Sequence, residues 1–298
     1  MPEKPGPTNV EDSRREEARS SAGLRRFIGP LFLAGLLLLI YSPAVRELFQ
    51  VLVADPNSSH GLLIPPLVAL LVWRKRKWLA EAPISSNRWA LLLVFGGAAL
   101  LPLGKAAEIA GLPALSLLLV IGGIVWHIWG NRVMRILLFP YLFLFFTIPW
   151  PGLLVETLTF PMQLISAKAA ALVLGLLGVA VGREGIELLL GNYTFAVGVP
   201  CSGMRSLAAL TALGALCAFL LKGSGYRRGF LFLMVPPVAL VGNAARIVVI
   251  LLIALRWGTE AANGFYHQFS GLLLFLITFL LLLGIARLIG LKQVREDI

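Results

Sequence analysis

Hydrophobic residues run through this chain in long blocks, and polar residues are largely confined to the short stretches between them. A membrane-spanning helix needs about 20 predominantly apolar residues. Several blocks approach this length, and the pattern does not sharply define the ends of the shorter ones. The pattern predicts an all-α, polytopic membrane bundle of about eight transmembrane helices, near residues 27–42, 58–73, 89–104, 112–129, 134–149, 203–221, 229–255 and 269–289.

One further block, residues 152–181, carries polar residues among its apolar ones. Glu156, Thr159, Gln163 and Ser166 are spaced so that a helix would place them along one stripe. A helix with a polar stripe lines a cavity or lies in the membrane interface. We expect an amphipathic or re-entrant segment on the outer side of the membrane rather than a ninth span, and the distribution of charge decides between the two.

Charge counting supports this topology. The basic residues lie in short clusters between the apolar blocks, as is typical of cytoplasmic loops. With both termini inside and 152–181 not crossing, the inside segments hold 19 of the 26 Lys and Arg. If 152–181 crossed, the clusters at 222–228 and 287–295 would move outside, against the positive-inside rule.

Composition narrows the class of protein. The chain is 58% hydrophobic and 14% charged, whereas a soluble domain is about half apolar and a quarter charged. The net charge of +11 does not predict nucleic-acid binding, because the basic residues form no continuous face. We expect a disordered cytoplasmic tail over residues 1–26, a single transmembrane catalytic domain over 27–289 and a cytoplasmic tail over 290–298.

The stretch "GVPCSGMRSL" places Cys201 at the entrance of an apolar helix. Pro200, Ser202 and Gly203 suit a turn that leads into that helix. Free amide hydrogens at a helix N-terminus favour the thiolate, which is a nucleophile. Cys217 lies 16 residues further along. Since this is about 24 Å of helix, the two thiols cannot pair, and Cys217 reads as a packing residue.

Two arginines accompany this cysteine. Arg246, in "VGNAARIVVI", lies inside an apolar block, and an intramembrane arginine normally faces the bundle interior with a partner. It is a structural arginine or it neutralises an anion formed at the site. Asn243 is a supporting candidate in the same stretch. Arg205 would orient a substrate or hold the turn.

Two histidines are the candidates for proton transfer. His267, in "GFYHQFSG", lies at the outer entrance of the last block and can protonate a leaving amine, or it belongs to an interfacial aromatic belt. His60 competes for the same role. The topology brings both histidines, Cys201 and Arg246 to one membrane level. No Cys/His cluster has zinc spacing and no glycine-rich loop suits phosphate, so neither a metal nor a cofactor is expected.

The order "VPCSGMRSL", "GNAARIVVI", "YHQFSG" resembles the exosortase/archaeosortase family of membrane-embedded cysteine transpeptidases. "DPNSSHGLLIPPLVALLVWRKRKWL" and "RILLFPYLFLFFTIPWP" are similar to that family's early helices, so the resemblance covers about residues 50 to 280. It implies that Cys201 is the nucleophile, Arg246 the essential arginine and His267 the third member. The archaeal branch carries arginine at that third position, so His267 places the chain with the bacterial exosortases.

The resemblance also implies a reaction. The substrates would be exported proteins with a C-terminal sorting signal, made of a short motif, a transmembrane helix and a basic cluster. Cleavage would proceed through a thioester at the periplasmic face of the bacterial inner membrane, with membrane lipid around the site. The acceptor that resolves the thioester, an amine or water, stays open.

Two other functions remain compatible with the residues. A transporter or channel would use Arg246 and the histidines for anion or proton handling, and Cys201 would be dispensable. An acyltransferase of another fold would leave lipid on its product rather than shorten a polypeptide.

Overall fold

A computed structural model describes residues 35–109, 111–149, 152–191, 193–198, 203–265 and 271–295. The chain forms two compact units, residues 1–47 and 48–298, and each is considered by itself. In the first unit the described residues belong to a long apolar helix, Gly35–Ala54, which continues into the second. Tyr41 and Ala44 are its most buried residues in that unit.

The second unit is mostly helical, which confirms the predicted all-α membrane class. Among the described residues, five helical stretches are long and apolar enough to cross a membrane, and three shorter apolar helices accompany them. The count of about eight spans stays a prediction. The helices of this unit are η1 (Ser59–Leu63), α2 (Ile64–Arg74), α3 (Arg76–Ala80), α4 (Ala90–Ala106), α5 (Leu112–Phe143), η2 (Leu144–Thr147), α6 (Gly152–Leu176), α7 (Met204–Leu220), α8 (Gly225–Leu233), α9 (Val235–Phe265) and α10 (Gly271–Leu288).

The helix α5 reverses direction at Gly130, whose φ of +79° and ψ of −169° are not helical. The Tyr141 hydroxyl donates to the Leu118 carbonyl at 3.2 Å, and the Tyr141 ring lies directly against Gly122. In a straight helix, Tyr141 would lie 19 residues, or about 28 Å, from Gly122 and farther still from Leu118. The chain therefore folds back at Gly130 into two antiparallel helices, in line with the separate apolar blocks at 112–129 and 134–149.

A small antiparallel sheet was not predicted. Strands β1 (Gly182–Glu184), β2 (Glu187–Leu190) and β3 (Tyr193–Ala196) pair in that order. Leu188 and Leu190 pack with Ile247 and Leu251 of α9 in a buried cluster. The all-α prediction holds for the bulk of the unit but did not include this sheet, because short strands between two helices leave little trace in a hydropathy pattern.

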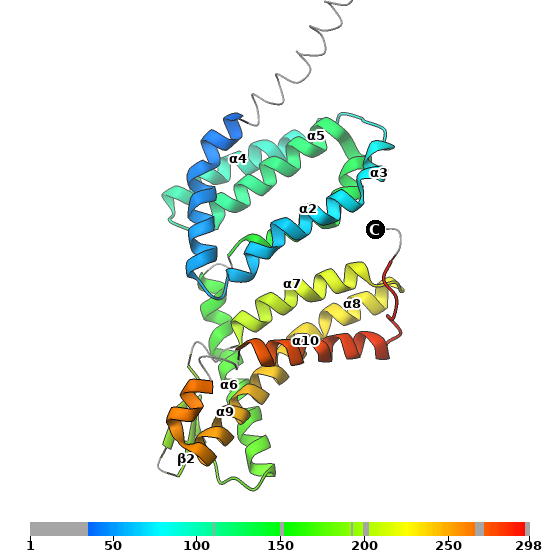
Figure 1. The fold of residues 1–298 in the computed structure, drawn as a ribbon. Coiled ribbons are helices and arrows are strands. Elements are labelled where there is room, and N and C mark those ends of the chain that lie inside the picture. The colour runs from blue at the N-terminus through cyan, green and yellow to red at the C-terminus, as the bar shows by residue number, and fades with distance from the viewer. Residues whose placement is uncertain are drawn as a thin grey trace, which may run out of the picture. The chain divides into compact units, whose positions relative to one another are not determined.

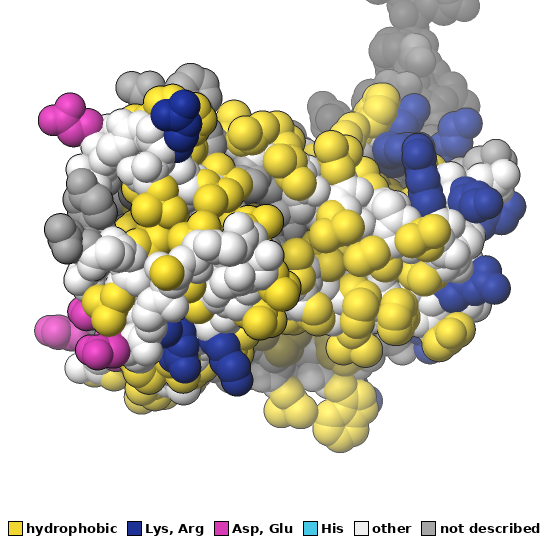
Figure 2. All heavy atoms as spheres, turned by 90° about the horizontal axis from the view of Figure 1, so that it is seen from below, with side chains coloured by type: hydrophobic (Ala, Val, Ile, Leu, Met, Phe, Trp, Pro, Cys, Tyr) yellow, Lys and Arg dark blue, Asp and Glu magenta, His cyan; other side chains and the backbone are white. Residues whose placement is uncertain are grey.

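Basic residues gather at one end of this unit. Lys75 Nζ and Arg295 Cζ lie 5.4 Å and 5.8 Å from the ring centroid of Phe219, at the C-terminal end of α7. The Lys222 amide donates to the Gln293 carbonyl at 2.8 Å, so the chain after α10 pairs with the chain after α7. Figure 2 shows most Lys and Arg of one face at one end, Asp and Glu at the opposite end, and apolar side chains between.

The helix α6 buries polar side chains and exposes leucines, the opposite of what a helix in water does. Its buried face includes Gln163 and Ser166, while Leu164, Leu172 and Leu176 are 36%, 66% and 80% exposed. A helix that hides amide and hydroxyl groups and exposes leucine is suited to apolar surroundings. Figure 1 shows α6 beside α9, directed away from α7, α8 and α10.

Candidate functional site

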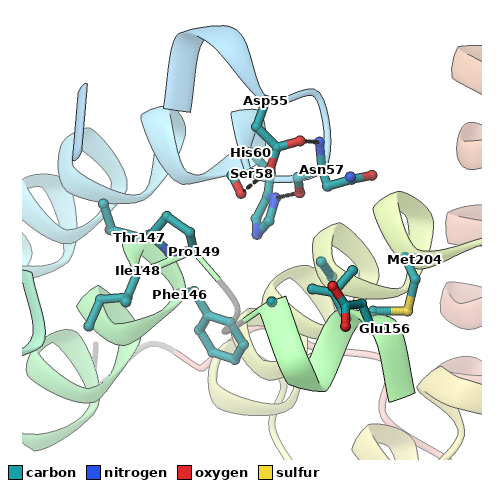
Figure 3. Close-up of a pocket in the computed structure, with 13 residues that line it drawn as sticks. Asp55, Asn57, Ser58, His60, Phe146, Thr147, Ile148, Pro149, Glu156 and Met204 are labelled. Carbon is teal, nitrogen blue, oxygen red and sulfur yellow. Dashed lines mark hydrogen bonds between the residues drawn. The ribbon is translucent and has the colours of Figure 1, made fainter. Parts of the chain in front are cut away.

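A cavity of about 240 Å³ opens at the end of α7 that lies away from the basic residues. The turn before α2, the residues around η2, the start of α6 and the first two turns of α7 form its walls, as Figure 3 shows. Its lining residues are Asp55, Asn57, Ser58, His60, Phe146, Thr147, Ile148, Pro149, Gly152, Val155, Glu156, Met204 and Ala208.

A hydrogen-bonded turn holds His60 at the wall of this cavity. Asp55 accepts two hydrogen bonds, from the Asn57 amide at 3.0 Å and from the Ser58 hydroxyl at 2.6 Å. His60 Nδ1 lies 3.1 Å from the Asn57 carbonyl oxygen, so Nδ1 carries the proton. His60 Nε2 is buried, and no described residue forms a hydrogen bond with it. The neutral ring therefore has a lone pair on Nε2.

A buried polar cluster connects α6 and α9. Arg246 Nη2 donates to Asn243 Oδ1 at 2.6 Å, and Asn243 Nδ2 donates to the Ser166 hydroxyl at 2.9 Å. Their exposed fractions are 9%, 4% and 0% for Arg246, Asn243 and Ser166. Arg246 therefore faces the protein interior with a side-chain partner, and the predicted polar stripe of 152–181 supplies Ser166 to the same cluster.

The chain on both sides of residues 199–202 is anchored to these two helices. On one side, Gln163 Nε2 donates to the Val197 carbonyl at 2.8 Å. On the other, Gly203 has a φ of +81°, and a Cβ there would lie 3.1 Å from Asn243 Cγ. The next residue, Met204, lines the cavity. The start of α7 thus lies between the Arg246 cluster and the cavity.

Three of the predicted site residues, Cys201, Ser202 and His267, lie outside the described residues. Of the others, the structure brings Asn243 and Arg246 together, and it places His60 on the cavity wall. Arg205 is exposed.

Two residues of the cavity were missed by sequence reasoning. Asp55 orders the His60 turn, and Thr147 has a buried hydroxyl for which the described residues offer no partner. The Asp-Pro pair at 55–56 is a turn signal that would have drawn attention to Asp55. Thr147 carries no such signal. Among the described residues, no group of three or more His, Cys, Asp or Glu could hold a metal ion.

Comparison with known proteins identifies the family. Residues 50–284 match the family described as transmembrane exosortase, so the chain belongs to the transmembrane exosortases. This confirms the family inferred from the three motifs. Exosortases are generally cysteine transpeptidases that act on exported proteins carrying sorting signals. The curated proteins and the solved structures with which the chain was compared gave no match.

Proposed function

We propose that this chain is a sorting cysteine transpeptidase that cuts the C-terminal signal of exported proteins through a thioester on Cys201. The observation that carries the proposal is the close approach of Gly203 to Asn243, whose side chain accepts a hydrogen bond from Arg246. Cys201 is two residues before Gly203, so chain connectivity keeps the two Cα atoms within about 7 Å. The described residues that flank this segment therefore include the start of α7 and, through Asn243, the Arg246 guanidinium.

This neighbourhood favours the first half of the reaction. Amide hydrogens at the start of α7 and a nearby guanidinium both stabilise a thiolate, and the thiolate attacks the scissile carbonyl. Because Arg246 is 9% exposed, its charge is weakly screened by water, and it stabilises the oxyanion strongly. Asn243 keeps the guanidinium in a fixed orientation.

The second half needs proton transfer and an acceptor. His267 protonates the departing amine as the membrane-anchored tail leaves, and an amine or water then resolves the thioester. Enzyme and substrate are both anchored in the bilayer, so much of the entropic cost of their encounter is paid beforehand.

The distribution of charge supports an outer location for this reaction. Lys75, Lys222 and Arg295 lie at the end of the unit away from the cavity. Basic loops stay on the cytoplasmic side of a membrane. The cavity and the start of α7 would then face the periplasm of a bacterial inner membrane, where exported substrates are presented.

Processing of a tail-bearing protein tests the proposal. The chain is co-expressed with a protein from the same genome that ends in a motif, an apolar helix and a basic cluster, and the size of that protein is followed. The parent shortens it, Cys201→Ala does not, and Cys217→Ala, the matched control near the C-terminal end of α7, shortens it normally. Processing by the Cys201→Ala variant would refute the proposal and would leave a transporter or another acyl transferase as the alternative.

A further inference from the structure

The cavity beside α7 contains buried polar groups that the reaction described above does not use. His60 Nε2 and the Thr147 hydroxyl are both buried and lack partners among the described residues, and Thr147 is only 7% exposed. An unpaired polar group in a protein interior costs about 1–3 kcal/mol, so such groups indicate a partner such as water, an ion or a ligand. Two of them on the wall of one cavity point to a polar occupant.

The charge of the lining defines the kind of occupant. Two carboxylates, Asp55 and Glu156, line the cavity, and the described lining residues include no lysine or arginine. Figure 3 shows the His60 ring directed into the space between Phe146 and Glu156. Carboxylates attract a cation, and a neutral imidazole nitrogen accepts a proton. A primary amine, which enters as an ammonium ion, matches both features.

The position of the cavity defines what this amine does. Met204 and Ala208 of α7 form one wall, while Gly203 contacts the Arg246 cluster. The start of α7 therefore has a cationic side, suited to an oxyanion, and an anionic side, suited to an amine. A water molecule takes about 30 Å³ of liquid volume. A cavity of about 240 Å³ thus has room for an amine and several attached atoms.

We infer that this cavity is the acceptor site of the transpeptidase, where His60 activates a primary amine that resolves the Cys201 thioester. The inference rests on the proposed function. His60 Nε2 takes one proton from the ammonium ion, and the nitrogen lone pair forms a C–N bond at the thioester carbonyl. The C–S bond breaks, the sulfur leaves with its electron pair, and it takes the second nitrogen proton. The products are an amide, a free Cys201 thiol and a protonated His60, which releases its proton to water.

Product mass tests the occupant in two arms. The full chain is placed in phosphatidylcholine nanodiscs with a tail-bearing substrate and soluble ethanolamine. In the second arm it is placed in nanodiscs containing phosphatidylethanolamine, without soluble amine. We expect an amide with ethanolamine in the first arm, and an amide in the second if the headgroup amine also reaches the cavity. A product that is only the free carboxylic acid in both arms would overturn the inference, because the cavity would then serve water.

Single-turnover kinetics test the role of His60. His60→Ala should slow thioester resolution by ethanolamine about 100-fold more than it slows release of the tail. The matched control is His127→Ala, since His127 Nδ1 likewise contacts a backbone carbonyl, that of Asn87 at 2.9 Å, but lies outside the cavity. Equal slowing of both steps by His60→Ala would overturn the assignment of His60 to the second step.

A second variant keeps the inference testable if His60→Ala does not fold. Glu156→Gln keeps the shape of an exposed side chain and removes its charge, so the ethanolamine concentration for half-maximal resolution should rise about fivefold. Glu184→Gln, on exposed strand β1, is the control. An unchanged ethanolamine dependence would count against the amine site.

The parent protein distinguishes the two proposals. If it releases no tail, the proposed function fails; if it releases the tail but never forms an amide, only the acceptor site fails.

Discussion

The two ends of the unit 48–298 use polar residues in opposite ways. At the cavity end, Arg246 and Asn243 are buried and hydrogen-bonded to other side chains. At the basic end, Lys75, which directly follows α2, and Arg295, in the segment after α10, lie over the ring of Phe219. Buried polar groups are expensive to keep, whereas charges at a membrane surface cost little. We therefore expect changes at the cavity end to affect catalysis, and changes at the basic end to affect stability and orientation.

After the loss of Cys201 itself, the largest effect is expected from Arg246→Gln. Loss of a charge that stabilises an oxyanion in a buried site costs about 100- to 1000-fold in rate. The control is Arg256→Gln, which removes an exposed arginine from the same helix. The initial rate of substrate processing measures both variants, and a comparable loss in the two would contradict a special role of Arg246.

A smaller effect is expected from Gly203→Ala. The φ of +81° is unfavourable for alanine by about 1–2 kcal/mol, and the new Cβ would press against Asn243. Because the start of α7 would shift, processing should fall about tenfold and the melting temperature in detergent should decrease. Gly229→Ala, where a Cβ meets nothing within 4 Å, should change neither quantity. Normal processing by Gly203→Ala would show that the contact with Asn243 is dispensable.

Ser166→Ala should have a modest effect on stability. It removes the acceptor of the 2.9 Å hydrogen bond from Asn243 Nδ2, and such a loss costs about 1 kcal/mol or more in a buried position. Thr157→Ala deletes an exposed hydroxyl of the same helix, which donates to the Leu153 carbonyl oxygen one turn earlier. Thermal unfolding of the two variants in detergent compares them directly. Equal melting temperatures would argue that the α6–α9 link contributes nothing.

The smallest effect on catalysis is expected at the basic end. Phe219→Leu removes the stack with Phe139, at 3.6 Å between ring centroids, together with the contacts to Lys75 and Arg295. We expect a loss of about 1 kcal/mol of stability and processing within twofold of the parent. A large loss of processing at unchanged stability would remove the distinction between the two ends.

The features that could be predicted from the sequence follow from the free-energy cost of placing polar groups in an apolar medium. Arg246 within an apolar block was expected to face the interior with a partner, as it does. Of the polar stripe of α6, Gln163 and Ser166 are buried, whereas Glu156 is exposed. The break between the blocks at 112–129 and 134–149 coincides with the reversal at Gly130. Each of these depends on local composition alone.

Other features depend on residues distant in sequence and were not predicted. The three-stranded sheet packs against α9, through Ile247 and Leu251, and its local signals in the sequence are short, such as the dipeptide Gly191-Asn192. The cavity combines the His60 turn with Thr147, which lies almost 90 residues later. Hydropathy reveals which segments are buried, but not which of their polar groups face a common space.

Chemical labelling of intact cells is the most direct test of where the reacting thiol lies. In a Cys217→Ala variant Cys201 is the single cysteine, so a membrane-impermeant maleimide reports its side of the membrane. We predict labelling of intact spheroplasts, and none in the variant that lacks both cysteines. Labelling that appears only after the membrane is permeabilised would place Cys201 on the cytoplasmic side and contradict an outward-facing transpeptidase.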